Sequence, residues 1–183
     1  MLKKMQKRFF ILYALFTLCV IVASALLVGH YVHLNYDYIV NPESSPGYSC
    51  GTPFGNGYDV WNVQGIYLPT CLLASLILFN MLGVAMHFCT SRWGHIMFLL
   101  ASAVAILAVA IAVLQGIEIE FLNPVLNVLL PFVELLLIPA GIVCAIFFFV
   151  WKKTLIAGHI VLLTLSMMAS CSMGFFWVYL YFD

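Results

Sequence analysis

Charged residues are scarce in this 183-residue chain: only 8% are Asp, Glu, Lys or Arg, and the formal net charge is zero. Hydrophobic residues make up 65% of the chain, compared with roughly half in soluble domains. A water-soluble core cannot enclose that much apolar surface, whereas a bilayer can surround it if the backbone forms its hydrogen bonds within helices. The composition therefore excludes an ordinary soluble domain and predicts an all-α integral membrane protein.

Motifs for nucleophilic or metal-dependent catalysis are absent from the sequence. It contains no G-x-S-x-G, no Walker loop, no H-E-x-x-H and no C-x-x-C. These patterns place a nucleophile, a phosphate-binding loop or a metal ligand pair in enzymes. An enzymatic function is therefore not expected.

Five stretches contain the roughly 20 apolar residues that a helix needs to cross a bilayer. They are 9–32, 66–88, 94–116, 125–151 and 155–182. The last two are separated only by 152–154, which predicts a tight hairpin. We expect a single transmembrane domain, 1–183, with five helices and one sizeable outer loop at about 33–65.

Basic residues all fall on one side of these five predicted spans. The seven are Lys3, Lys4, Lys7, Arg8, Arg92, Lys152 and Lys153. Because Lys and Arg are kept on the cytoplasmic side of a membrane, the N-terminus is predicted to be cytoplasmic and the C-terminus extracytoplasmic. In this arrangement six of the seven acidic residues lie on the outer side.

The remaining acidic residue, Glu134, lies in the apolar stretch "LLPFVELLLIP". An ionised carboxylate within a bilayer costs on the order of 2.5–3.5 kcal/mol, so Glu134 is expected to face a polar partner or a cavity. One interpretation is a buried helix contact, within this chain or with a partner. The other is a proton or cation relay. A relay normally needs several polar groups, and the cytoplasmic half of the predicted spans offers almost none, which favours the helix contact.

Small residues recur at helical spacing in two of the predicted spans. One row is Ser166, Ser170 and Gly174, and the other is Ala101, Ala105, Ala108 and Ala112. Such rows let helix backbones approach closely in lipid. They predict helix packing, either inside the chain or against a partner.

Candidate metal ligands lie at the outer end of the first predicted span. They are His30, His33 and Asp37. If the helix continues that far, they share one face and could form a two-histidine, one-carboxylate site. The alternative is that they are ordinary interfacial residues. A second cluster, His87, Cys89 and His95, lacks the fourth ligand of a structural zinc site.

Among the six cysteines, only Cys50 is plainly outside the predicted spans. Its best disulfide partner is Cys71, early in the second span on the outer side. The alternative is a free thiol.

Two segments resemble claudins and peripheral-myelin-protein-type tetraspan membrane proteins. "WNVQGIYLPTCLLASLILFN", from Trp61, is similar to the start of their second helix, and "LLPFVELLLIPAGIVCAIFFFVWKK" to their fourth helix with its basic end. The resemblance implies roles in adhesion, barriers or channel accessory subunits. The first loop departs from claudins because it lacks their paired cysteines and W-x-GLW pattern, and a fifth helix is added.

The function expected from the sequence is that of an accessory, assembly or interaction subunit of a larger membrane complex. Its partners would be lipid, other membrane-protein subunits or further copies of the chain, with no nucleic acid and no cofactor. One alternative is a small ion- or proton-conducting component that uses Glu134. Another is a metal-binding or redox subunit that uses His30, His33 and Asp37. The plasma membrane or a bacterial inner membrane is favoured over an organelle.

Overall fold

A computed structural model of the chain describes residues 2–34, 68–114 and 129–182, and these ranges are helical apart from short turns. The helices are α1 (Leu2–Leu34), α4 (Leu68–Ala85), the short 3-10 helix η3 (Met86–Phe88), α5 (Arg92–Leu114), α7 (Leu130–Val150) and α8 (Thr154–Phe182). No strand occurs in the described ranges. The all-helical class predicted from composition is confirmed.

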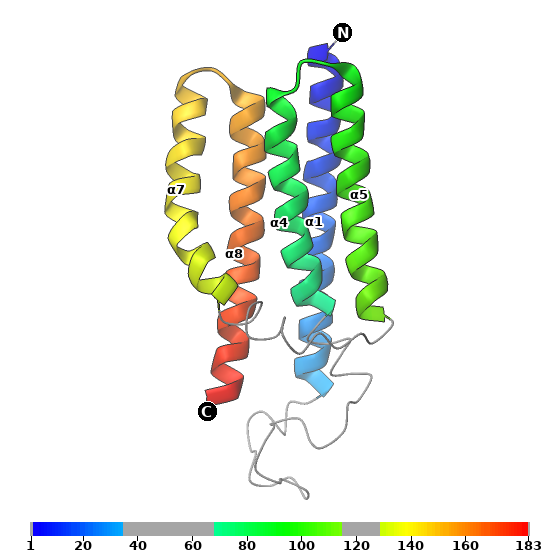
Figure 1. Cartoon of the computed structure of the whole chain (residues 1–183). Coiled ribbons are helices and arrows are strands. Elements are labelled where there is room, and N and C mark those ends of the chain that lie inside the picture. The colour runs from blue at the N-terminus through cyan, green and yellow to red at the C-terminus, as the bar shows by residue number, and fades with distance from the viewer. Residues whose placement is uncertain (1, 35–67, 115–128, 183) are drawn as a thin grey trace, which may run out of the picture.

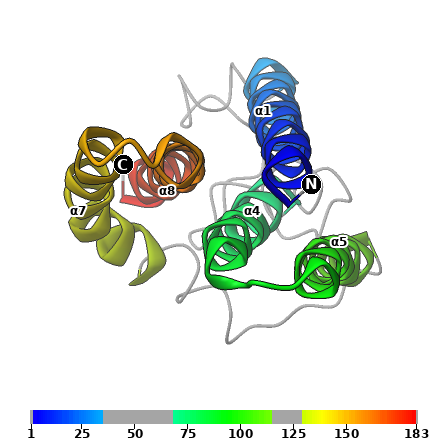
Figure 2. The ribbon, with the colours of Figure 1, turned by 90° about the horizontal axis from the view of Figure 1, so that it is seen from above.

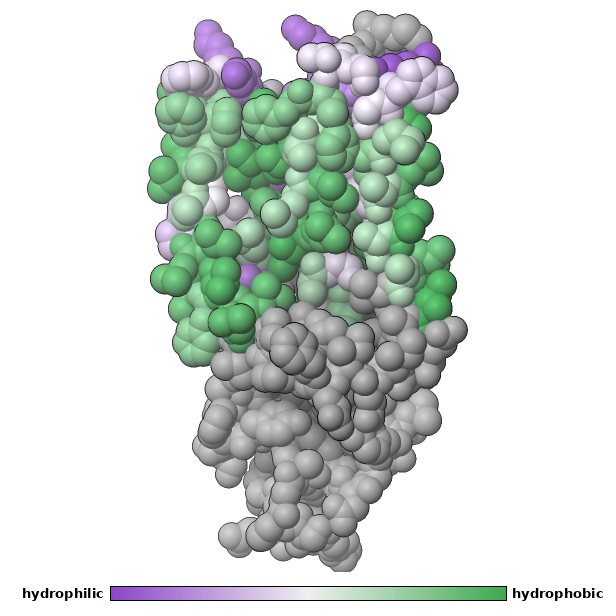
Figure 3. Space-filling model, viewed as in Figure 1, coloured by the Kyte–Doolittle hydropathy of each residue, from purple (hydrophilic) through white to green (hydrophobic). Residues whose placement is uncertain are grey.

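The long helices run alternately up and down, so the N- and C-termini lie at opposite ends of the bundle (Figure 1). The N-terminus, the α4–α5 connection and the α7–α8 turn share one end, which we call the basic end. All seven Lys and Arg residues of the chain belong to these segments, and hydrophilic side chains gather at this end in Figure 3. The common end expected for the basic residues is therefore a feature of the fold, while the six acidic residues expected on the opposite side lie outside the described residues.

Four helical segments are long and apolar enough to cross a membrane. They are Lys3–His33, Leu68–Phe88, Leu130–Val150 and Thr154–Phe176, while the described apolar part of α5, Arg92–Ala108, is shorter. Large apolar side chains cover the outside of the bundle (Figure 3); Leu26 is 69% exposed and Leu136 77%. Such a surface is unfavourable in water and is typical of a multi-pass membrane protein.

The helix ends differ in detail from the predicted spans. α1 begins at Leu2, because its basic first turns continue the helix, rather than at residue 9. The described part of α4 is Leu68–Ala85, and it continues into η3 up to Phe88, where the predicted span 66–88 also ends. The described part of α7 begins at Leu130, where Pro131 suits the first helical turn. Residues 66–67 and 125–128 of the predicted spans lie outside the described residues. Most of the predicted outer loop, 33–65, lies outside the described residues.

α4 is the central helix, and it packs against α1, α5 and α8, whereas α7 packs mainly against α8 at the edge of the bundle (Figure 2). α1 also contacts α8. The buried apolar cluster between these helices consists of Tyr13, Tyr31, Leu73, Leu76, Phe79, Leu162 and Met173. The structure is therefore a four-helix core with α7 attached through one neighbour.

A side-chain cap fixes the start of α5. The Gly94 backbone N–H donates a hydrogen bond to Ser91 Oγ at 3.0 Å. This is the contact by which a serine before a helix satisfies one of the free N–H groups of the first turn. It positions α5 directly after the short connection from η3.

The α7–α8 turn is closed by two backbone hydrogen bonds. The Lys153 N–H donates to the Phe148 carbonyl at 2.9 Å, and the Lys152 N–H donates to the Phe149 carbonyl at 3.0 Å. This pairing is the Schellman motif, which requires a left-handed residue after the helix. Lys152 supplies it with a φ of 58° and is the only non-glycine residue with positive φ in the described part of the chain.

We predict that Lys152→Gly preserves or stabilises the hairpin, because glycine adopts this backbone conformation without strain. Lys152→Val should lower stability by about 1–2 kcal/mol, because a branched Cβ clashes in the left-handed region. Lys153→Val removes the same charge one residue later and is the matched control. Thermal unfolding of the purified variants in mild detergent measures the difference. Equal losses for the two valine variants would contradict this account of the turn.

Candidate functional site

Glu134 lies in the seam between α7 and α8 and is only 2% exposed. Neither carboxyl oxygen makes a hydrogen bond within the described residues, although the Ser170 hydroxyl of α8 is close enough to interact with the carboxyl. The neighbouring Cys171 thiol donates instead to the Pro131 carbonyl at 3.5 Å. Glu134, which was expected to face a polar partner or a cavity, is therefore enclosed by its own chain. The Ser170 hydroxyl lies beside its carboxyl group.

A second buried polar group joins three helices of the core. Asn80 of α4 donates from Nδ2 to Thr17 Oγ1 of α1 at 3.0 Å and to Ser166 Oγ of α8 at 2.8 Å. All three side chains are buried. Ser166 in turn donates to the Leu162 carbonyl at 2.8 Å, one turn earlier in its own helix. Asn80 therefore links α1, α4 and α8 through groups that lipid could not satisfy.

α1 and α5 are joined by a pair of hydroxyl groups. Tyr13 Oη and Ser102 Oγ lie 2.9 Å apart, and both residues are fully buried. Ser102 uses its one proton to donate to the Phe98 carbonyl at 2.6 Å. Tyr13 must therefore be the donor in the interhelical bond. Its ring also stacks on Phe79 of α4, with centroids 4.1 Å apart.

His95 at the basic end is fully buried and held in one tautomer by its contacts. Nδ1 lies 2.7 Å from the Ser91 carbonyl oxygen, which can only accept, so Nδ1 carries a proton. In the neutral ring, the His95 Nε2 is then an acceptor. The side-chain amide of Gln6 in α1 donates a hydrogen bond to it, with 3.1 Å between the two nitrogens. His95 thus ties the first turn of α5 to the first turns of α1.

A pair of histidines connects η3 with α8 nearby. His87 Nε2 lies 2.9 Å from His159 Nδ1, which is also 3.0 Å from the Leu155 carbonyl. His159 is fully buried, with the Phe10 and Tyr13 rings in T-shaped contact with its ring, and its Nε2 has no partner in the described part of the chain. His87 is half-buried, so the pair runs from the basic end into the core.

These contacts correct one step of the sequence argument. The half of the spans toward the basic end was expected to contain almost no polar groups, and the described residues correct that expectation. Thr17, Asn80 and His159 are all buried there. Their positions could not be recognised from hydropathy because each stands alone in an apolar stretch.

The two rows of small residues lie in different surroundings. Ser166, Ser170 and Gly174 of α8 are buried inside the chain. In contrast, Ala101 and Ala108 of α5 are exposed and Ala105 is half-buried, while the side chain of Ala112 lies outside the described residues. The α8 row packs this bundle together, and the α5 row faces mostly outward.

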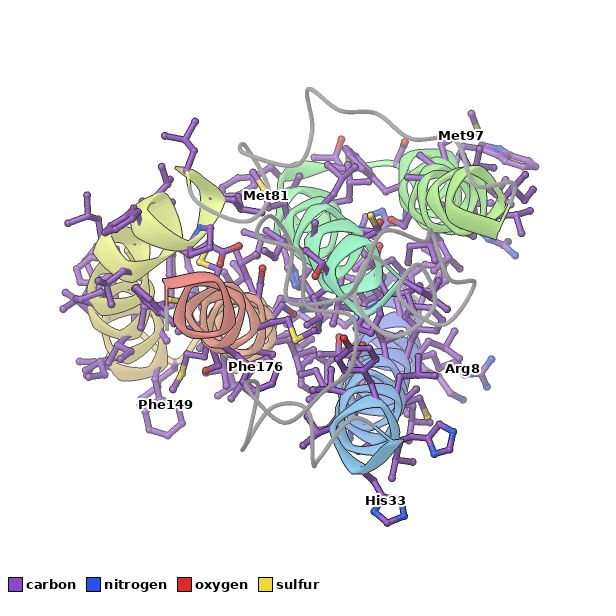
Figure 4. The ribbon with its side chains drawn as sticks, turned by 90° about the horizontal axis from the view of Figure 1, so that it is seen from below. Arg8, His33, Met81, Met97, Phe149 and Phe176 are labelled. Carbon is purple, nitrogen blue, oxygen red and sulfur yellow. The ribbon has the colours of Figure 1, made fainter. Side chains whose placement is uncertain are left out.

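Two of the three candidate metal ligands, His30 and His33, lie within the described residues. His30 and His33 are exposed near the end of α1 that lies opposite the basic end, and His33 points away from the other helices in Figure 4. Asp37 lies outside the described residues. Within residues 2–34, 68–114 and 129–182, no group of three or more His, Cys, Asp or Glu side chains is arranged to hold a metal ion. A metal site at this end stays a prediction.

The predicted disulfide likewise stays a prediction. Cys50 lies outside the described residues. Cys71 is half-buried in the first turn of α4.

Comparisons with protein-family models, curated proteins and solved structures give no match. The resemblance to claudin-type tetraspans therefore stays a prediction.

We predict that Asn80→Ala lowers the stability of the bundle by about 1–3 kcal/mol, because its hydrogen bonds to Thr17 of α1 and Ser166 of α8 are lost and each such interhelical bond contributes about 0.6–1.7 kcal/mol in a membrane protein. Ser172→Ala is the matched control, since exposed Ser172 bonds only to the Met168 carbonyl of its own helix. Unfolding in mixed micelles measures both variants. If the control destabilises the protein as much as Asn80→Ala, the three-helix link has no special role.

Proposed function

We propose that this chain is a five-span membrane protein that acts as a non-enzymatic accessory or assembly subunit, by packing α5 against a helix of another membrane-protein chain. Support comes from how the small-residue rows are used. The chain buries its α8 row against its own helices but leaves Ala101 and Ala108 of α5 exposed. Small residues at a lipid-facing position let a second backbone approach closely.

The outward face of α5 also has the spacing of a helix-packing seam, and this observation carries the proposal. Met97, Ala101, Val104, Ala108 and Ile111 are all exposed and are separated by four, three, four and three residues. That spacing is the heptad pattern by which two helices pack at a shallow angle, in membranes as in coiled coils. Met97 points away from the bundle in Figure 4. We call these five residues the α5 seam.

The orientation proposed for the chain places the basic end in the cytoplasm. All seven Lys and Arg residues belong to segments at that end, and such residues are retained on the cytoplasmic side during insertion. The N-terminus is then cytoplasmic and the C-terminus extracytoplasmic. The membrane proposed is the plasma membrane or a bacterial inner membrane.

We predict that Ala108→Leu and Ala101→Leu each reduce retention of the partner chain by about tenfold, because overfilling a close-packed contact costs about 1–3 kcal/mol. Ala23→Leu is the matched control, since Ala23 is an exposed alanine of α1. The measurement is co-purification in mild detergent from the native membrane, followed by quantitative mass spectrometry. Cross-linking through Ala108→Cys identifies the contacting helix and shows whether it belongs to a second copy.

The proposal fails if both α5 variants retain the same associated chains as wild type and Ala23→Leu. A general loss of membrane insertion in the α5 variants would also be visible, as reduced protein in the membrane fraction. The Ala23→Leu control separates that effect from a lost contact.

A second candidate function is an ion or proton pathway. The observation that favours it is the presence of buried polar side chains along the length of the bundle: His159 and Asn80 toward the basic end, and Glu134 toward the other. Flux into proteoliposomes that contain this chain alone tests it. Flux lost in Glu134→Gln would support the pathway, and absence of flux would exclude it for the isolated chain.

A further inference from the structure

The α7–α8 seam is closed tightly on both sides of Glu134. Toward the basic end, a Cβ added at Gly141 would lie 2.5 Å from Thr164 Oγ1. Toward the opposite end, a Cβ at Gly174 would collide with the Pro131 ring. The two backbones therefore approach closely above and below the acid, and the carboxyl group is enclosed between these two contacts.

The two carboxyl oxygens of Glu134 lack the hydrogen-bond donors that normally accompany a buried carboxyl group. Both carboxyl oxygens of Glu134 are fully buried and make no hydrogen bond to the described residues. The Ser170 hydroxyl is close enough to interact with the carboxyl group, and the Cys171 thiol is directed to the Pro131 carbonyl. A carboxyl group left unsatisfied in an apolar interior costs several kcal/mol unless it is neutralised.

The enclosure also supplies the ligand chemistry of a small cation. Carboxylate, hydroxyl and carbonyl oxygens are the ligands that hard cations prefer. Pro139 lies inside α7 and has no N–H, so the Leu135 carbonyl, one residue beyond Glu134, lacks its usual intrahelical donor.

We propose that Glu134 is an exchangeable binding site for a small monovalent cation, a proton or a sodium ion, within the α7–α8 seam. Binding removes the net charge of the carboxylate and lets α7 remain packed on α8. Release leaves a carboxylate that the seam cannot satisfy, so α7 and α8 separate there. The site is independent of the α5 seam.

The construction of α7 permits that separation. Only Pro131, Glu134 and Ala145 are buried among its described side chains, and the helix packs mainly on α8. α7 bends in its first half, before the straighter segment that leads to the basic end (Figure 1). The segment that carries Glu134 can therefore move without disturbing the four-helix core.

Dicyclohexylcarbodiimide tests the site, because this apolar reagent partitions into the membrane and reacts with protonated carboxyl groups. The full chain in lipid nanodiscs is treated over a series from acidic to alkaline pH, with sodium chloride or with choline chloride at equal ionic strength. Peptide mass spectrometry then measures the fraction of Glu134 modified. Glu134→Gln shows which adduct belongs to this residue.

Labelling should fall as pH rises, because the proton leaves the acid. Protection by sodium but not by choline would identify sodium as a ligand, whereas a dependence on pH alone would identify the proton. Ser170→Ala should weaken sodium protection about tenfold, or raise the pH of half-maximal labelling by about one unit, because an interaction with the charged carboxylate is lost. Ser172→Ala, on the exposed face of the same helix, should leave both unchanged.

Two results would overturn the proposal. Glu134 that stays unlabelled at every pH is closed to exchange, and Glu134 that is labelled equally at every pH and sodium concentration is a permanently neutral acid. Neither result affects the α5 seam, whose test uses different variants and a different readout.

Discussion

A bilayer interior offers no water to a polar side chain, so a polar group there is costly unless it finds a partner within the protein. Asn80 meets this constraint most completely, because its amide bonds to Thr17 of α1 and Ser166 of α8. Lipid provides no hydrophobic driving force between helices, so such bonds and close packing determine which helices meet. The central position of α4 in the bundle follows from this arrangement.

The polar contacts of the core are concentrated toward the basic end. Tyr13 bonds to Ser102, His95 to Gln6, and His87 to His159. They connect α1 with α5 and η3 with α8 close to the short connections between helices. Between α7 and the core, the described residues show only a weak hydrogen bond, from the Cys171 thiol of α8 to the Pro131 carbonyl at 3.5 Å. The buried acid of α7, Glu134, lacks a hydrogen-bond partner within the described residues, which makes α7 the helix best suited to move.

Hydropathy predicts much of this fold because the cost of placing charge in lipid is large. The long apolar stretches, the common end for Lys152, Arg92 and the N-terminus, and the exceptional position of Glu134 all follow from it. Which face of each helix points inward does not follow, since helices that are apolar all round show little amphipathic signal. The partners of Asn80 and His159 depend on that rotation, so the sequence could not predict them.

The two small-residue rows illustrate the same limit. Both have helical spacing, and nothing in their residue types distinguishes them. The structure buries Ser170 and Gly174 inside the chain but leaves Ala101 and Ala108 facing outward. The α8 row therefore packs inside the chain, whereas the α5 row is available to another chain. The proposed function depends on that difference.

Native mass spectrometry of the wild-type protein, extracted in mild detergent from its own membrane, tests this functional account most directly. The account predicts a stoichiometric second polypeptide, either a different membrane protein or another copy of the chain. A lone monomer that retains its bound lipids would contradict it.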